Sequence, residues 1–325
     1  MKIDVHNHAI PQPAVDLLNR DPVYGVTIED GVWRGGVHVN FELAPSFLDA
    51  GAKLAELESK GLEGAVVSVS PTIFYYHVDA EAGEAIAVAG NEGLAAMTSE
   101  RLRWMASVPL QAPERAAAVL AEAVEAGAVG VEIGTSAAET PLDDPSLEPF
   151  WAAAEKLGAP VMLHPAYVPK HPRLGDFYLE NVIGFPLETT IAIERLICAG
   201  VLDRHPDLRV VLVHAGGYFP WQAGRLRHAR TVRPELAESP TDPWSYIGQV
   251  LLDPITHDAD ALRYMVGKVG AENIVLGTDL PFDMATPDPL AALRAAVDEE
   301  TVAQITERNP AELYRFTTEG ITSRA

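Results

Sequence analysis

Short apolar runs alternate along the whole chain with longer segments in which apolar residues recur at helical spacing. Beyond the first run, at residues 1–8, strands are predicted at 64–70, 102–110, 128–134, 160–164, 210–214, 250–253 and 273–279. Helices are predicted between them, at 113–126, 147–157, 187–199, 259–269 and 289–297. Eight strand and helix units whose strands are almost continuously apolar predict an α/β fold, namely a (β/α)8 TIM barrel.

Two segments do not fit a plain barrel. Residues 11–45 contain Asp21-Pro22 and Gly35-Gly36, which predict a small insertion after the first strand, either irregular or a β-hairpin. Residues 171–186 are predicted to form a loop that ends where a helix starts at Pro186 and that lines the site. No linker divides the sequence, so a single domain is expected over residues 1–325, with the insertion at about 11–45.

Polar side chains follow several of the predicted strands. His6 and His8 share one face of the first strand, because side chains alternate between faces, and together they could grip a metal ion. His164, His214 and Asp279 end the fifth, sixth and eighth strands, at the end of the barrel where such folds carry their chemistry. A single histidine in this setting is more often a core residue, but the whole set indicates a mononuclear metal site. Imidazoles with one carboxylate suit Zn²⁺, although Mn²⁺, Fe²⁺ or Co²⁺ could occupy the same geometry.

Composition narrows the range of partners. The formal net charge of -22 argues against nucleic acid or an anionic membrane as a partner, because either needs a basic face. An anionic substrate would therefore need locally placed arginines. The N-terminus does not read as a secretory leader and no long apolar stretch occurs, so a cytoplasmic location is expected. Cys198 is the only cysteine, which excludes an internal disulfide and a cysteine-rich zinc site.

Four motifs resemble the amidohydrolase superfamily: His6-x-His8, Leu163-His164-Pro165, His214-Ala215-Gly216-Gly217 and Gly277-Thr278-Asp279-Leu280-Pro281-Phe282. More narrowly, the chain resembles the branch that contains aminocarboxymuconate semialdehyde decarboxylase and related aromatic-acid decarboxylases. The resemblance implies that His6, His8, His164 and Asp279 bind the metal and that His214 deprotonates the metal-bound water. It implies no organic cofactor. Asp279 could also relay a proton, and the alternative for His214 is a fifth metal ligand.

The segment HAGGYFPWQAGR, residues 214–225, also resembles the family, in which the closing arginine reaches into the neighbouring subunit. The resemblance thus implies a homodimer in which Arg225 binds a substrate carboxylate near the partner's active site. Arg34 resembles a second substrate-binding arginine, on the insertion, and an exposed surface arginine is the alternative. Aromatic residues after the strands could hold a planar acid: Phe74, Tyr75, Tyr76, Tyr167, Trp221 and Phe282.

Two departures from family patterns bear on the metal. Binuclear amidohydrolases use a carbamylated lysine at the end of the fourth strand, where this chain has Glu132 and no lysine. A binuclear centre is therefore disfavoured, with Glu132 as the only residue there that could bridge two ions. Salicylate-type decarboxylases that prefer manganese begin with Glu-x-His, whereas this chain begins with His-x-His, which favours zinc.

The resulting hypothesis is a metal-dependent, non-oxidative decarboxylase of an unsaturated or aromatic carboxylic acid, similar to aminocarboxymuconate semialdehyde decarboxylase. The alternative is a hydrolase or hydratase that acts on a lactone, amide, ester or C=C bond with the same ligands. A third possibility is a barrel that retains zinc for structure alone, whose coordination sphere would be closed.

Overall fold

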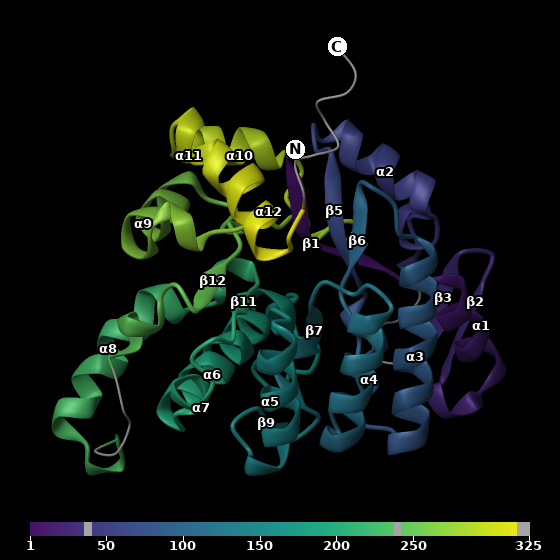
Figure 1. Ribbon diagram of the computed structural model, residues 1–325, viewed down its shortest axis with the longest axis horizontal. Helices are drawn as coiled ribbons and strands as arrows, with labels where there is room; N and C mark the ends of the chain where they lie inside the picture. The colour runs from purple at the N-terminus through teal and green to yellow at the C-terminus, as the bar shows by residue number, and fades with distance from the viewer. Residues whose placement is uncertain (36–40, 237–241, 317–325) are drawn as a thin grey trace.

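Parallel strands form the centre of the computed structural model, which describes residues 1–35, 41–236 and 242–316 (Figure 1). The strands run in the orders β1-β5-β6 and β7-β10-β11-β12. A bridge between Ala106 and Val131 joins the two groups. Their bounds are β1 (Ile3–Ala9), β5 (Gly64–Val69), β6 (Leu102–Trp104), β7 (Val131–Gly134), β10 (Val161–His164), β11 (Val210–Leu212) and β12 (Val250–Leu252).

Residues 274–280 close the ring between β12 and β1. Ile274 bridges to Leu252 and Leu280 bridges to Asn7, so the eighth segment contacts both neighbours as a barrel requires. The expected (β/α)8 fold is thereby confirmed. The expected regular strand at 273–279 is not, because Asn273 lies in a short helical turn and Asp279 has a left-handed backbone with φ 67°. The segment is instead joined to its neighbours by the two bridges and by separate backbone hydrogen bonds, such as the one from Val5 N–H to the Leu276 carbonyl.

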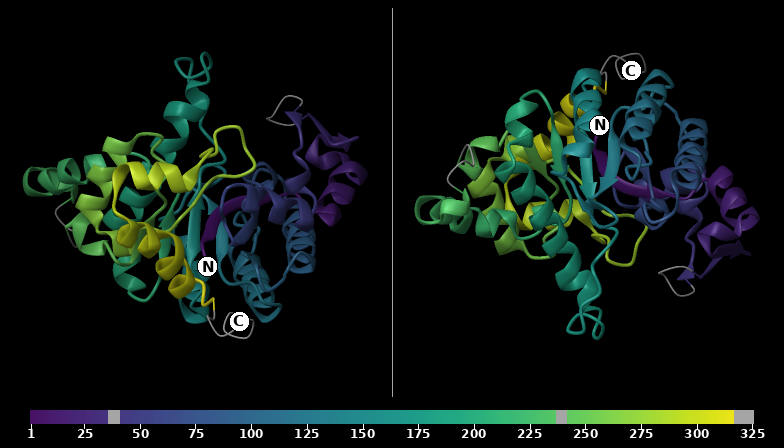
Figure 2. Two further views of the ribbon diagram at one scale, coloured as in Figure 1. Left: turned by 90° about the horizontal axis from the view of Figure 1, so that it is seen from above. Right: turned by 90° about the horizontal axis from the view of Figure 1, so that it is seen from below.

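Helices surround the strands, as Figures 1 and 2 show from three directions. Each predicted helix is present within about two residues of its expected bounds. The helices are α2 (Ala50–Ser59), α3 (Ala80–Ala96), α4 (Pro113–Glu125), α5 (Glu148–Leu157), α6 (Phe185–Cys198), α7 (Val201–Arg204), α8 (Phe219–Val232), α9 (Ala259–Val269), α10 (Pro289–Ala296), α11 (Glu299–Ala303) and α12 (Asn309–Leu313). Helix α8 extends to one side of the molecule in Figure 1. No helix in the described ranges is long and apolar enough to cross a membrane.

The insertion after β1 is more regular than expected. It contains α1 (Gln12–Arg20) and an antiparallel sheet of β2 (Val26–Glu29), β3 (Val32–Gly35) and β4 (Phe41–Glu42), and residues 36–40 lie outside the described part. The β2–β3 hairpin agrees with the prediction, whereas the helix was not expected. Trp33 of β3 is buried against Phe41, with 5.8 Å between the ring centroids, so the insertion has apolar packing of its own. It lies at the opposite side of Figure 1 from α8.

The core has an inner and an outer part. Apolar side chains from successive strands fill the barrel interior, and Tyr314 and Phe316 from the C-terminal segment pack with them. The strand contributions to this interior group include Ile3, Val5, Val66, Met105, Met162, Val211 and Val275. A larger apolar group fills the space between strands and helices. The barrel interior is thus a packed core, and the candidate site lies at the carboxyl ends of the strands.

Candidate metal centre

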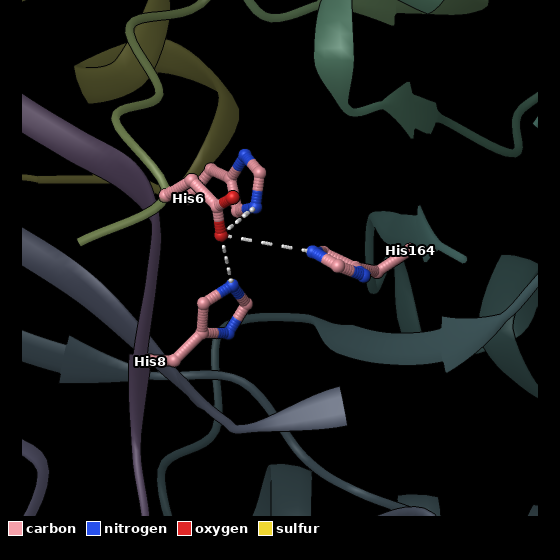
Figure 3. Close-up of side chains that lie close together, drawn as sticks. His6, His8 and His164 are labelled. Carbon is pink, nitrogen blue, oxygen red and sulfur yellow. Dashed lines mark hydrogen bonds and ion pairs between the residues drawn. The ribbon is translucent and has the colours of Figure 1, made fainter. Parts of the chain in front are cut away.

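Three imidazoles converge on one carboxylate. His6, His8, His164 and Asp279 each offer a ligand atom, and these atoms lie within 4.8 Å of one another. The Asp279 Oδ1 atom is 3.4 Å from His6 Nε2, 3.1 Å from His8 Nε2 and 3.8 Å from His164 Nε2. Figure 3 shows the three labelled rings pointing toward this shared oxygen. The four residues that the sequence predicts as metal ligands therefore lie together.

A bulge in β1 turns both of its histidines toward the site. The ladder between β1 and β5 pairs Asp4 with Ala65 and Asn7 with Val67, so β1 has one extra residue between these pairs. Such a bulge re-aims the side chains that follow it. Val5 lies in the apolar filling of the barrel, while His6 and His8 both reach the metal cluster.

Gly277 lets the eighth segment pass close to His6. A Cβ atom at this position would lie 2.7 Å from the His6 Cβ and 2.9 Å from the Asp253 Cβ. Both distances are too short for real carbon contacts. Only glycine therefore fits here without moving a histidine of the cluster, and Asp279 follows two residues later.

His6 and His164 each have a close partner for the ring nitrogen that faces away from Asp279. The His6 Nδ1 atom is 2.7 Å from Asp253 Oδ2, and the His164 Nδ1 atom donates to the Pro165 carbonyl over 2.9 Å. Because a carbonyl only accepts, the His164 Nε2 atom carries the lone pair that faces Asp279. Such partners fix the tautomer and the orientation of metal-binding imidazoles. Asp253 is itself held by the backbone N–H groups of His214, Ala215 and Ile255.

Charges in the cluster are strongly coupled. Burial raises and four neighbouring imidazoles lower the pKa of Asp279, and the imidazoles win, so it lies well below the ordinary value. For His6 burial opposes the charged form, but Asp253 and Asp279 raise its pKa to about 10. Burial dominates at His8, where it lowers the pKa to about 4, and at His164, whose pKa also falls well below normal. In the absence of a metal ion the cluster thus pairs an ionised Asp279 with a protonated His6, while burial keeps His8 and His164 neutral.

His214 lies beside the four residues of the candidate metal cluster. Its Nε2 atom is 3.5 Å from Asp279 Oδ2, whereas the three other histidines face Oδ1. It follows β11 in a tight turn, with φ 53°, and its side chain remains partly exposed. Gly217 makes this turn possible, since a Cβ there would lie 2.1 Å from the Pro186 carbonyl oxygen. The position between the cluster and the open side suits a group that exchanges protons.

Glu132 lies on the far side of His8 from Asp279. Its Oε1 atom is 3.9 Å from His8 Nδ1, and neither of its oxygens has a hydrogen-bond partner. The Ser68 hydroxyl, 3.4 Å from His8 Nδ1, is the other polar group there. Burial raises the pKa of Glu132 to about 8. Glu132 is not part of the four-residue cluster found among the described residues.

Two buried contacts fix the backbone that carries the ligands. Asp4 accepts hydrogen bonds from the Thr278 hydroxyl over 2.6 Å and from the Thr278 backbone N–H over 3.1 Å. This pair joins β1 to the segment that ends in Asp279. Lys53 of α2 is fully buried and donates to the His8 carbonyl over 2.8 Å.

The donor set fits a divalent metal ion. The His6 and His164 Nε2 atoms are buried without a hydrogen-bond partner and face the same carboxylate. Ligands about 2.1 Å from a tetrahedral ion lie roughly 3.4 Å apart, close to the 3.1 to 3.8 Å between Asp279 Oδ1 and the Nε2 atoms of His6, His8 and His164. A metal site is thus indicated, and three imidazoles with one carboxylate are ligands of zinc and related transition metals.

A cavity of about 320 Å³ opens above the cluster. His214 and Asp279 lie in its wall with Trp221, which stacks on Tyr264 of α9 at 4.5 Å between ring centroids. Asn181, Val182, Phe185 and Pro186 also line it, which agrees with the role expected of residues 171–186. That segment includes a short helical stretch, Glu180–Gly184, and α6 begins at Phe185, one residue before the expected start.

The other predicted substrate residues lie in three different places. The Phe282 ring contacts His8, with 5.4 Å between centroids, and so borders the cluster. Arg225 lines a separate groove of about 420 Å³ between α6 and α8, with Tyr218, Gln222 and Glu194. Arg34 is half-exposed on β3, 3.7 Å from Glu29. Within the described chain neither arginine lines the cavity that holds His214.

Sequence reasoning missed Asp253, Lys53 and the Asp4–Thr278 pair. Asp253 had a usable signal, since it ends a predicted strand just as His164 and Asp279 do. Lys53 and Asp4 had none, because a lysine in an amphipathic helix and an aspartate near a chain start are usually exposed.

The fold and the cluster together define a (β/α)8 barrel with a metal site at the carboxyl ends of its strands. A family model described as amidohydrolase matches residues 3–316. The chain is 32% identical over 303 residues to the 2-amino-3-carboxymuconate-6-semialdehyde decarboxylase of Dictyostelium discoideum, covering 87% of this chain and 82% of that protein. This chain belongs to the amidohydrolase family, as the sequence motifs predicted.

Two further similarities agree. The gamma-resorcylate decarboxylase of Rhizobium radiobacter is 28% identical over 260 residues, which cover 71% of this chain and 76% of that protein. The crystal structure of the IDCase of Metarhizium anisopliae in its apo form matches with a TM-score of 0.85 and 25% identity over 97% of each chain. The barrel is therefore shared with solved structures over nearly its whole length.

Proposed function

We propose that this protein is a metal-dependent, non-oxidative decarboxylase of an unsaturated or aromatic carboxylic acid. The observation that carries the proposal is the convergence of three imidazole Nε2 atoms on Asp279 with His214 beside it. That arrangement alone does not separate decarboxylation from hydrolysis or hydration. The named activities of the curated relatives, a carboxymuconate semialdehyde decarboxylase and a resorcylate decarboxylase, favour decarboxylation.

The residues divide the work as follows. His6, His8, His164 and Asp279 would hold the ion, which when bound supplies a Lewis acid that lowers the pKa of a coordinated water. His214 accepts the released proton at Nε2 and is within reach of Asp279 Oδ2 for a relay. Proton delivery to the carbon that bears the carboxylate turns the conjugated system into an acceptor for the C–C bonding pair, and CO2 departs.

Zinc is the proposed ion. His6 and His8 give the site a third imidazole where manganese-dependent members of the branch have a carboxylate, and nitrogen-rich donor sets favour zinc over manganese. Metal analysis of the purified protein, followed by stripping and reconstitution with Zn²⁺, Mn²⁺, Fe²⁺ and Co²⁺, tests this. Highest specific CO2 release with Mn²⁺ would overturn the zinc assignment and leave the reaction class intact.

The deciding experiment is a time course of substrate absorbance with parallel CO2 detection. The substrates are freshly generated aminocarboxymuconate semialdehyde and a panel of hydroxybenzoates, each with and without chelator. We expect chelator-sensitive CO2 release and loss of that release in His214→Asn. Substrate loss without CO2 would instead support the hydrolase or hydratase.

Cytoplasmic location remains a prediction, which cell fractionation tests.

The active form is proposed to be a homodimer in which Arg225 binds a substrate carboxylate in the partner's site. In support, Arg225 lines a groove apart from its own subunit's cavity, and the exposed Leu187 of α6 lines the same groove. Its forked guanidinium matches a carboxylate bidentately. Arg34 is proposed as a second anchor, with Trp221 and Phe282 against the planar part of the substrate.

Complementation tests the shared site. Arg225→Ala and His164→Ala should each be inactive alone, and mixed dimers should regain up to about a quarter of wild-type activity, because one of two sites in half of the dimers is then intact. Sedimentation gives the dimer fraction, and Arg227→Ala is the surface control. Inactive mixed dimers would contradict the shared site.

A further inference from the structure

The β12–α9 loop places a second histidine in the wall of the cavity. His257 lines the same cavity as His214, Asp279 and Trp221. The loop begins at Asp253, which orients His6, so the strand end that supports the metal cluster also carries His257. Its side chain is exposed and lies at the open side of the cavity, whereas the cluster is buried.

The backbone holds His257 in an uncommon conformation. Its φ is 53°, in the left-handed region that non-glycine residues rarely adopt. Hydrogen bonds on both sides maintain it: the Thr256 hydroxyl donates to the Asp258 carbonyl over 2.8 Å, and the Asp258 carboxylate caps α9 at Ala261 N–H over 2.8 Å. Backbone strain of this kind is concentrated at ligand-binding sites. The imidazole is therefore presented from a fixed turn.

A carboxylate substrate in this cavity requires a cationic or hydrogen-bond-donating side chain in the wall. The chain carries a formal net charge of -22, and Asp279 adds a carboxylate to the cavity wall. Among the described residues that line this cavity there is no lysine or arginine. Apart from His214, His257 is the one side chain in that lining that can become cationic, and its ring N–H donates to a carboxylate even when neutral.

We propose that His257 is a further substrate-positioning residue, which binds an acidic group of the substrate other than the carboxylate that is lost. The inference rests on the proposed function, since it takes the His214 cavity as the substrate site. With one acidic group at the metal cluster and a second at His257, a planar di-acid lies along Trp221. His257 thereby favours di-acids over mono-acids.

Direct binding tests the assignment without turnover. Calorimetric titration of the metal-loaded protein with isophthalate and with benzoate gives two dissociation constants, and their ratio isolates the second carboxylate. His257→Gly removes the imidazole while keeping the left-handed backbone accessible. We expect isophthalate to bind the wild type more tightly than benzoate and the variant to lose about tenfold for isophthalate only, the size of one charge-assisted hydrogen bond.

Controls separate the possible failures. His228→Gly changes an exposed histidine of α8 outside the cavity lining and should leave both constants unchanged. Metal content and melting temperature of each variant show whether the cluster is intact. Equal losses for both acids, no loss, or no wild-type preference for isophthalate would overturn the role of His257. Absence of CO2 release from every substrate, with the isophthalate preference retained, would count against the decarboxylase alone.

Discussion

Asp253 contacts the cluster residue His6 and is expected to strengthen the binding of a metal ion there. Its Oδ2 atom is 2.7 Å from His6 Nδ1, and three backbone N–H groups hold the carboxylate in place. Asp253→Asn keeps the shape but removes the charge, so we expect metal affinity to fall about 10- to 100-fold. Competition with a fluorescent chelator measures this. Asp260→Asn, an exposed aspartate of α9, is the matched control, and equal affinities in both variants would contradict the role of Asp253.

The buried carboxyl group of Glu132 is expected to make the stability of the protein depend on pH. Burial raises its pKa from 4.5 to about 8, so the folded metal-free protein keeps a proton that the unfolded chain loses above about pH 4.5. Stability therefore declines as pH rises from about 5 to about 8, by roughly 1.4 kcal/mol per pH unit from this group. Glu132→Gln removes that decline. Its free energy of unfolding in urea, relative to that of the wild type, should therefore increase with pH. Glu125→Gln, exposed on α4, should run parallel to wild type; a Glu132→Gln curve that also runs parallel would refute the proton uptake.

Among the secondary-structure elements, the sequence pattern predicted those whose positions depend on local hydrophobic periodicity. Seven strands, the helices between them and the ligands at strand ends follow from apolar spacing and from the rule that barrel chemistry lies at carboxyl ends. The bulge in β1, the irregular eighth segment and the Asp4–Thr278 pair were not predictable, because each depends on contacts between residues far apart in sequence. The four residues of the candidate metal cluster could thus be predicted from the sequence, whereas the residues that hold them in place could not.

Replacing Gly277 tests whether the eighth segment must pass close to β1. In Gly277→Ala the new methyl would meet the Cβ atoms of His6 and Asp253 at 2.7 and 2.9 Å, so β1 and the segment must separate. We expect a loss of about 1 to 3 kcal/mol in the free energy of unfolding and weaker metal binding. Gly267→Ala in α9 is the control, because a Cβ there meets nothing within 4 Å and should stabilise the helix slightly. Retained metal affinity in Gly277→Ala would show that the segment yields without disturbing His6.

Across the whole molecule, the residues of the candidate metal cluster come from the beginning, the middle and the later part of the chain. His6 and His8 lie on the first strand, His164 on β10 in the middle, and Asp279 on the segment that closes the barrel. A bound ion therefore links the parts whose association closes the ring, and it stabilises the folded state in proportion to the logarithm of its concentration. The inner apolar group, which joins β1 to the C-terminal Tyr314 and Phe316, crosses the same junction.

We therefore expect residues 1–325 to unfold as one unit whose stability depends on the bound metal ion. Removing the ion with chelator should lower the melting temperature by about 5–10 °C, the shift expected for a few kcal/mol of linked binding. Circular dichroism and tryptophan fluorescence should follow the same transition, because Trp33 of the insertion and Trp104 and Trp151 of the barrel are all buried in one apolar group. A separate early transition reported by Trp33→Phe difference fluorescence would show that the insertion unfolds on its own. An unchanged melting temperature after verified metal removal would mean that the ion contributes to chemistry without contributing to closure of the barrel.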